Sequence, residues 1–136
     1  MPKTSGLGKK GEERAAAALE AAGMKIIGRN YRSKYGEIDI IALDGETVVF
    51  VEVKAWSVFG IENLQYSINN RKKHKIIKTA NFFLSENRKY SNMAIRFDVV
   101  FVKINRISGE SKESKGFQES EGFQITHLAS AFTESV

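Results

Sequence analysis

The apolar and polar positions in residues 9–22 follow a helical pattern. This stretch is rich in alanine, the strongest helix former, and it is followed by Gly23, a natural C-cap residue. Glu12 and Glu13 lie near its start, where negative charge interacts favourably with the helix dipole. The pattern predicts a first helix over residues 9–22.

A second stretch, residues 70–88, places its apolar side chains at the spacing i, i+4, i+7 and i+8, which gives one apolar stripe on a helix. The residues of this stripe are Ile76, Ala80, Phe83 and Leu84. The opposite face is basic and carries Lys72, Lys75 and Lys78. We therefore predict an amphipathic helix over residues 70–88.

Runs of β-branched and aromatic residues, several of them alternating with polar residues, predict five strands. The expected strands cover residues 24–32, 37–43, 47–54, 94–104 and 123–128. Asp44-Gly45, between the second and third strands, is among the strongest short hairpin signals. We expect these two strands to pair antiparallel across that turn.

The order of the elements is helix, three strands, helix and two strands, which predicts an α/β domain with a mixed central sheet flanked by helices. A loop is expected over residues 55–68, and the polar, Gly/Ser-rich residues 108–122 are expected to form a flexible hairpin loop. The last residues are expected to form a helical turn. A length of 136 residues suits a single domain over residues 1–136.

Composition narrows the class of protein. The chain contains no cysteine, which excludes disulfides, thiol nucleophiles and cysteine-ligated zinc. No run approaches the roughly 18 apolar residues that a membrane-spanning helix needs. The first residues do not resemble a secretory signal. We expect a cytoplasmic protein without a membrane partner.

The net charge of +5 is distributed in blocks along the chain. Residues 1–36 carry eight basic and three acidic side chains, and residues 67–106 carry ten and two. Between them, residues 37–66 carry one basic and six acidic side chains. Basic segments around an acidic one are what a phosphate-binding surface beside a cation-binding pocket requires, although scattered surface charge is an alternative interpretation.

Charged residues interrupt two strands that are otherwise apolar. Glu52 and Lys54 end the third strand and, being two positions apart, point to one face of the sheet. Asp39 lies between Ile38 and Ile40 in the second strand. The predicted hairpin places Asp39 roughly across from residues 50–52, so it can approach Glu52 on a shared face.

Two converging carboxylates beside a lysine suit the hydrolysis of phosphodiesters. Carboxylate oxygens and a backbone carbonyl, here that of Val53, are ligands that Mg²⁺ or Mn²⁺ accepts. The metal lowers the pKa of a bound water, and Lys54 can orient that water or offset developing charge. The alternative is a buried ion pair that fixes the register of the strands.

The spacing of Asp39, Glu52 and Lys54 resembles the PD-(D/E)xK nuclease motif. Over nearly its whole length the chain resembles the bacterial YraN family of uncharacterised small proteins. The matching segments are Gly11-Glu12, Ala15, Leu19, Arg29-Asn30, Gly36 to Ile40, Val49 to Lys54, Phe59-Gly60, Arg71-Lys72, Arg96 to Val100, His127 and Ala131-Phe132.

The resemblance implies a restriction-endonuclease-like fold of the kind also found in Holliday-junction resolvases. In those relatives a glutamate of the first helix completes the metal site. Glu12 is its match, and Glu13 is the alternative if the register differs by one. The resolvases act as dimers, so a homodimer is a further expectation.

Contacts to nucleic acid are expected from residues around this core. The candidates are Arg71, Lys72, Lys75, Lys78 and Trp56. Trp56 occupies a position where the family commonly has a basic residue, so it either stacks on an unpaired base or packs beneath a loop. Arg96 and Asp98 are expected to pair within the scaffold, and His127 is expected to be structural.

The sequence predicts a metal-dependent endonuclease acting on DNA, with branched or damaged structures among the candidate substrates. One alternative is a non-catalytic nucleic-acid-binding module on the same fold. Another is a nuclease that acts on RNA, because both nucleic acids present the same phosphate charge. The intact Asp39, Glu52 and Lys54 favour an enzyme, since a protein that only binds has no need of a costly buried triad.

Overall fold

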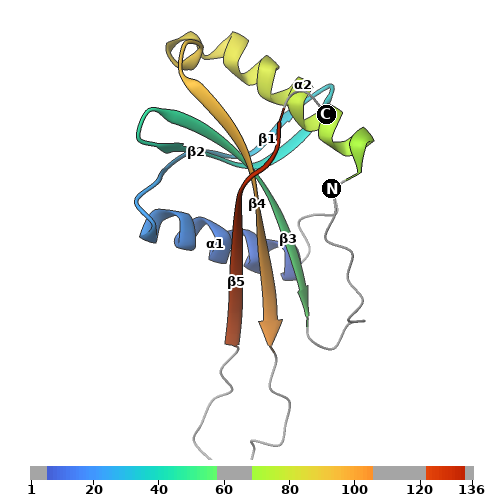
Figure 1. Ribbon diagram of the computed structural model, residues 1–136. Coiled ribbons are helices and arrows are strands. Elements are labelled where there is room, and N and C mark those ends of the chain that lie inside the picture. Colours follow the sequence, from blue (N-terminus) through green and yellow to red (C-terminus); the bar gives the residue numbers. More distant parts are fainter. Residues whose placement is uncertain (1–5, 58–68, 106–121, 134–136) are drawn as a thin grey trace, which may run out of the picture.

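A five-stranded sheet separates two helices (Figure 1). The computed structural model describes residues 6–57, 69–105 and 122–133. The elements are α1 (Gly6–Ala21), β1 (Lys25–Ser33), β2 (Gly36–Asp44), β3 (Thr47–Ser57), α2 (Asn70–Glu86), the 3₁₀ turn η2 (Arg88–Tyr90), β4 (Ala94–Asn105) and β5 (Gly122–Phe132).

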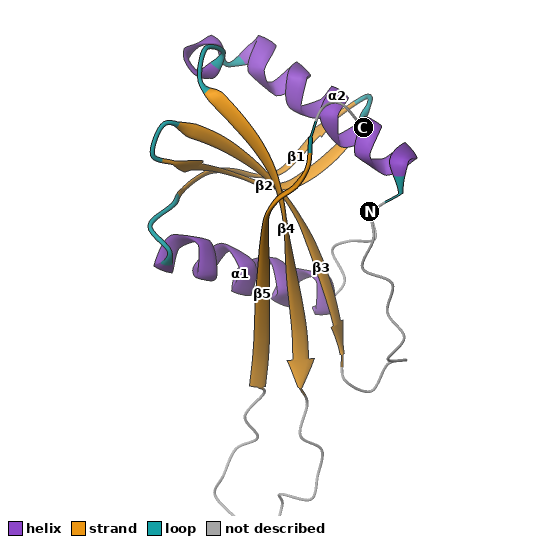
Figure 2. Cartoon of the chain, in the orientation of Figure 1, coloured by secondary structure: helices purple, strands orange, loops and turns teal. Residues whose placement is uncertain are grey.

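The strands lie side by side in the order in which they occur in the sequence. β3 and β4 are parallel, and every other neighbouring pair is antiparallel. The parallel pair requires a crossover connection, and α2 lies within it. The predicted mixed α/β sheet is confirmed, and with helices on both faces it fits the restriction-endonuclease-like fold (Figure 2).

The Asp44-Gly45 turn forms the predicted hairpin. Asp44 pairs with Thr47, and the antiparallel ladder between β2 and β3 continues as far as the pair Ile40 and Val51. Gly45 has a φ of 64°, a conformation that glycine adopts without steric cost.

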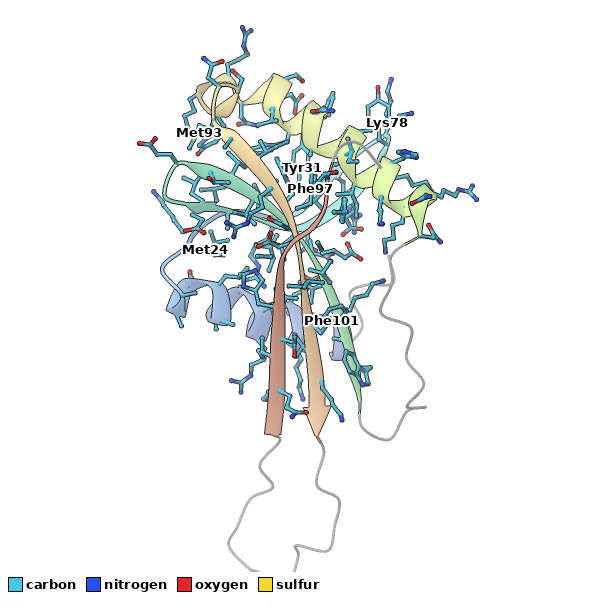
Figure 3. The ribbon with its side chains drawn as sticks, viewed as in Figure 1. Met24, Tyr31, Lys78, Met93, Phe97 and Phe101 are labelled. Carbon is cyan, nitrogen blue, oxygen red and sulfur yellow. The ribbon has the colours of Figure 1, made fainter. Side chains whose placement is uncertain are left out.

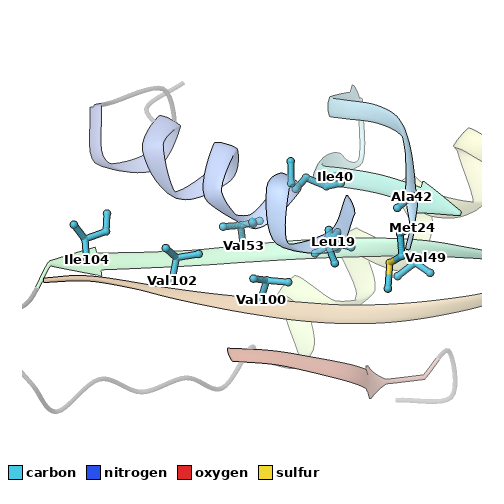
Figure 4. Packing of buried hydrophobic residues seen from close by; sticks show 12 residues of the cluster. Leu19, Met24, Ile40, Ala42, Val49, Val53, Val100, Val102 and Ile104 are labelled. Carbon is cyan, nitrogen blue, oxygen red and sulfur yellow. The ribbon is translucent and has the colours of Figure 1, made fainter. Parts of the chain in front are cut away.

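Helix α1 covers one face of the sheet through Ala15, Ala16 and Leu19, which pack on apolar side chains of β2, β3 and β4 (Figure 4). It ends at Gly23, with φ 98°, where the Met24 N–H donates to the Leu19 carbonyl and the Gly23 N–H to that of Glu20. This hydrogen-bond pattern is a Schellman motif, as the glycine predicts.

The approach of α1 to β3 is very close at Gly11. A Cβ atom placed on Gly11 would overlap the Ala55 side chain. Only glycine therefore allows the first turns of α1 to lie this near to the strand that carries Glu52 and Lys54.

Helix α2 covers the other face of the sheet. Asn69 caps its start by accepting a hydrogen bond from the Lys72 N–H at 2.8 Å. Ile76, Ala80 and Phe83 are buried against the sheet, which confirms the predicted apolar stripe. Lys75 and Lys78 are exposed, as expected of the basic face, but Lys72 was wrongly placed there, because it is only partly exposed and reaches the buried Glu52.

Most boundaries are shifted by a few residues from the sequence predictions, and two of the shifts change the expected structure of a segment. β3 continues to Ser57, so Ala55 and Trp56 belong to a strand and not to a loop. β5 continues to Phe132 where a helical turn was expected. Ser130, with φ 53°, lies at an irregularity after which Phe132 rejoins the ladder opposite Phe97 and stacks on its ring at 5.0 Å.

Residues 58–68 of the loop predicted at 55–68, and residues 108–121 of the loop predicted at 108–122, lie outside the described residues. Neither described helix has the length and apolar character needed to cross a membrane.

Candidate active site

β2 and β3 stop pairing next to Asp39. Their ladder ends at the pair Ile40 and Val51. Ile38 packs on the α2 side of the sheet and Ile40 on the α1 side, so the alternation of the strand breaks between them. Asn30 on the neighbouring strand β1 has a φ of 52° at the same level. The side chain of Asp39 consequently does not point to the face of the sheet that regular strand alternation would give it.

The side chain of Asp39 instead reaches toward β3. Its Oδ2 accepts a hydrogen bond from the Val53 N–H at 2.7 Å, and the residue is 1% exposed. In a strand, the N–H and carbonyl of one residue point toward the same neighbouring strand. The Val53 carbonyl therefore points toward β2 as well. The Asp39 carboxylate and this carbonyl thus offer two oxygen atoms as possible metal ligands where the two strands stop pairing.

Glu52 faces α2 and is 4% exposed. Its Oε2 lies 2.8 Å from Lys72 Nζ, on the first turn of α2, and 3.8 Å from Lys54 Nζ. Phe50 beside it belongs to the cluster that α2 buries, which confirms the direction of this face. Glu52 and Lys54 thus share a face as predicted, but Asp39 does not join them there.

Glu12 comes from the opposite side of the sheet. It is buried on α1, whereas its neighbour Glu13 is exposed, so the helix directs Glu12 inward. Among the residues that the structure describes, no three acidic or histidine side chains are gathered into a ready metal site. Glu12 approaches from the α1 side of the sheet and Glu52 from the α2 side, and the β2–β3 ladder ends beside Asp39.

The donors nevertheless fit a hard divalent cation in their chemistry. Three buried carboxylates and a backbone carbonyl are the oxygen ligands that Mg²⁺ and Mn²⁺ favour, and the chain has no cysteine to select a softer metal. Burying three carboxylates is costly unless a cation or hydrogen bonds compensate for the lost water. The residue types suit the metal, whereas in this structure the three carboxylates are not close enough together to bind one ion.

The remaining candidate residues differ in what they contact. Arg71, Lys75 and Lys78 are exposed on α2, where a phosphate chain can reach them. Figure 3 shows Lys78 on this helix. Trp56 is half-buried and packs edge-on against Phe101, with ring centroids 6.5 Å apart. The loop beneath which Trp56 was expected to pack lies outside the described residues, so both alternatives for Trp56 stay predictions.

A second buried acid, Asp98 on β4, holds a dense network. Its two oxygens accept hydrogen bonds from Arg96, at 3.0 Å each, and one of them also accepts the Ser130 N–H at 2.9 Å. His127 Nε2 lies 2.7 Å away, and Arg96 also donates to Asp44 at 3.0 Å. The expected pairing of Arg96 with Asp98 is confirmed, and His127 belongs to the same network.

The protonation of Asp98 reflects these contacts. Burial acts to raise the pKa of Asp98, but the hydrogen bonds from Arg96, Ser130 and His127 outweigh it and lower that pKa. The hydrogen bond to Asp98 in turn raises the pKa of Arg96. The charged pair is therefore maintained across the neutral range.

The contact between Lys72 and Glu52 was not expected from the sequence. The two residues are twenty positions apart, and only the crossover through α2 brings them together. Lys72 was assigned to phosphate binding by its basic helix face and by the Arg71-Lys72 motif. Helical spacing is the signal that was missed, because Lys72 lies four residues before Ile76 and so extends the apolar stripe toward the sheet.

Comparison with known proteins places the chain among uncharacterised relatives. Residues 11–102 match the uncharacterised protein family UPF0102. A UPF0102 protein of Treponema denticola is 45% identical over 93% of this chain and 94% of its own length. One of Treponema pallidum is 39% identical over the full length of both chains, and one of Persephonella marina is 43% identical over 74% and 85%.

Proposed function

The chain belongs to the uncharacterised protein family UPF0102, which is the YraN family of small bacterial proteins, and we propose that it is a metal-dependent nuclease. The observation that carries the proposal is that two buried carboxylates, Asp39 and Glu52, lie where the β2–β3 ladder ends, with Lys54 Nζ 3.8 Å from Glu52. A divergence between two strands gives a reacting phosphate access to carboxylates that the sheet otherwise covers.

The proposed metal ligands are the carboxylates of Asp39, Glu52 and Glu12 and the carbonyl of Val53. When bound, Mg²⁺ or Mn²⁺ would polarise the phosphoryl group of the substrate and lower the pKa of a bound water. Lys54, on the same face as Glu52, holds its ammonium where it can orient that water or offset negative charge that develops in the transition state. Glu12 completes the site from α1, which Gly11 holds close to β3.

Lys72 has two successive contacts in this proposal. In the present structure its ammonium pairs with Glu52 at 2.8 Å. The lysine side chain is 42% exposed, so a phosphate group can reach it from solvent. A phosphate that takes Lys72 releases the Glu52 carboxylate for the metal, which couples arrival of the nucleic acid to completion of the site.

A non-catalytic nucleic-acid-binding module is the second candidate. The absence of a gathered group of three acidic side chains within the described residues favours it. In that case the contact of Glu52 with Lys54 and Lys72 is a permanent ion-pair cluster that links β3 to α2. The two candidates differ in whether phosphodiester bonds are cut.

The deciding experiment uses purified protein and labelled duplex, single strand, flap, four-way junction and RNA, each with Mg²⁺, Mn²⁺ or EDTA. We expect cleavage of a DNA substrate with metal and none with EDTA. Asp39→Asn and Lys54→Ala should lower single-turnover cleavage by about 100-fold or more, because they remove a metal ligand and a charge aligned with the transition state.

Lys89→Ala, which removes a distant exposed lysine, is the matched control and should cut like the wild type. Tight binding of the panel by the wild type, with no cleavage under any metal condition, would establish the binding module instead. Cleavage confined to RNA would assign the nuclease to RNA.

A further inference from the structure

An open depression lies between the β1–β2 turn and α2. It has a volume of about 380 Å³ and is lined by Tyr35, Lys78, Asn81 and Phe82. That volume is at the lower end of the roughly 300–1,000 Å³ typical of ligand pockets. We name it the Tyr35 pocket.

The aromatic wall of the Tyr35 pocket is accessible. Tyr35 is 37% exposed, although its ring is large and mostly apolar. Phe82 meets the Tyr35 ring edge-on, with centroids 6.3 Å apart and planes at 65°. The contact braces one edge of the Tyr35 ring and leaves more than a third of the residue open to a planar ligand.

The charge around the ring is positive. Lys34 Nζ and Lys78 Nζ lie 5.4 and 5.8 Å from the centroid of the Tyr35 ring. Glu86, one turn after Phe82 on α2, accepts a hydrogen bond from the Tyr31 hydroxyl at 3.0 Å. Burial and the neighbouring Glu86 raise the pKa of Tyr31 to about 12. The Tyr31 hydroxyl therefore stays protonated and continues to donate its hydrogen bond to the Glu86 carboxylate.

The Tyr35 pocket is held beside the proposed active site by α2. Gly36, at the start of β2, lies against the helix, where a Cβ would come within 3.3 Å of Thr79 Oγ1. Lys72, which contacts Glu52, and Lys78, in the pocket, are six residues apart on the same helix. That separation is about 9 Å along the axis with roughly 240° of rotation around it, so the two lysines lie on different sides of one rigid helix.

We propose that the Tyr35 pocket binds one unpaired nucleobase of the nucleic acid that the active site cuts. The inference rests on the proposed nuclease function. Any base presents a π face that can stack on Tyr35, and the Asn81 amide offers a donor and an acceptor to the edge of the base. Lys34 and Lys78 hold the flanking phosphates. Substrates with a short single-stranded stretch are therefore preferred over blunt duplex.

The test measures binding in EDTA, where no cleavage occurs. The probes are a blunt DNA duplex and the same duplex with a single-stranded extension that carries the fluorescent base 2-aminopurine. Dissociation constants come from anisotropy, and stacking is followed by quenching of the 2-aminopurine emission. The variants are Tyr35→Ala, Tyr35→Phe, which keeps the ring, and Lys78→Ala.

Lys89→Ala is the matched control, because Lys89 likewise lies over a tyrosine ring, that of Tyr90 at 5.2 Å, but in η2 beyond the end of α2. Tyr35→Ala should weaken binding of the extended duplex by about tenfold and abolish the quenching, within the range that stacking one base contributes. Tyr35→Phe should retain both properties. Lys78→Ala should weaken binding about threefold more than Lys89→Ala does.

Equal affinity of wild type and Tyr35→Ala for the extended duplex would overturn the proposal, and so would equal losses on blunt and extended duplex. The tyrosine is at the surface, so circular dichroism should show an unchanged fold for each variant. If the protein cuts DNA but shows no quenching, only the proposal for the Tyr35 pocket is overturned. If Tyr35 quenches the 2-aminopurine emission but the protein cuts no substrate, only the proposal of a nuclease function is overturned.

Discussion

Asp98 and Glu52 are buried acids on adjacent parallel strands, but their surroundings differ in kind. Asp98 is 0% exposed and is held by the rigid guanidinium of Arg96, a backbone N–H and His127. Glu52 is held by two lysines, of which the nearer is 42% exposed. The first set of contacts is built from groups that cannot leave without disturbing the sheet. The second uses a flexible side chain that solvent or a ligand can draw away.

The difference separates structural from functional use of a buried charge. A carboxylate satisfied by its own strand and by the neighbouring strand's backbone stabilises the fold and offers little to a ligand. A carboxylate whose partner is an exposed lysine can exchange that partner for another cation. Burial alone therefore does not indicate a site, whereas burial with an exchangeable partner does.

The largest expected effect is on stability. Asp98→Asn should lower the free energy of unfolding by about 3 kcal/mol, because it leaves the largely buried Arg96 charge with only the exposed Asp44 as a carboxylate partner. Glu52→Gln should change it by less than about 1 kcal/mol, because burial of the charge is relieved as the ion pair is lost. Urea denaturation in EDTA measures both. A Glu52→Gln variant as unstable as Asp98→Asn would show that the two acids are equivalent.

A smaller effect is expected on metal affinity. Lys72→Ala removes the cation that competes for Glu52 and should tighten Mn²⁺ binding by about tenfold, or roughly 1.4 kcal/mol, measured by calorimetry. Lys75→Ala makes the same change in net charge on the same helix at an exposed position. It should leave Mn²⁺ binding nearly unchanged. Equal affinities in the two variants would remove Lys72 from any role at the metal site.

The smallest effect is on acid sensitivity. The pKa of Asp98 is lowered in the folded protein, so its contribution to stability is complete above the unfolded value of about 3.9 and is lost as pH falls through the folded value. The stability gap between wild type and Asp98→Asn should therefore be constant from pH 5 to 7 and should narrow below about pH 4. Urea midpoints at each pH measure the gap, and a gap that widens in acid would contradict this assignment.

Much of the fold could be predicted from the sequence because its strongest signals are local. The apolar stripe of α2, the Gly23 cap and the Asp44-Gly45 turn each depend on neighbours within a few residues, and all three are confirmed. The end of β5 could not be predicted this way. The Ser130 N–H bonds to Asp98, thirty-two residues away, and this contact replaces the expected helical turn.

The candidate site was predictable in its residues but not in its geometry. Regular alternation would place Asp39 on the face of Glu52, whereas the break between Ile38 and Ile40 directs it toward β3. The approach of Lys72 to Glu52 depends on where the crossover places α2. The Tyr35 pocket joins a turn to a helix more than forty residues later, and no periodicity connects them.

The hydrogen bond between Val53 and Asp39 also makes the site observable without substrate. One backbone amide proton of a central strand is bonded to the carboxylate proposed as a metal ligand, at 2.7 Å. A cation that draws electron density from that carboxylate weakens the bond and moves the amide resonance of Val53. The sheet thus carries its own spectroscopic reporter, in which the nuclear magnetic resonance signal of one peptide group follows the occupancy of the site next to it.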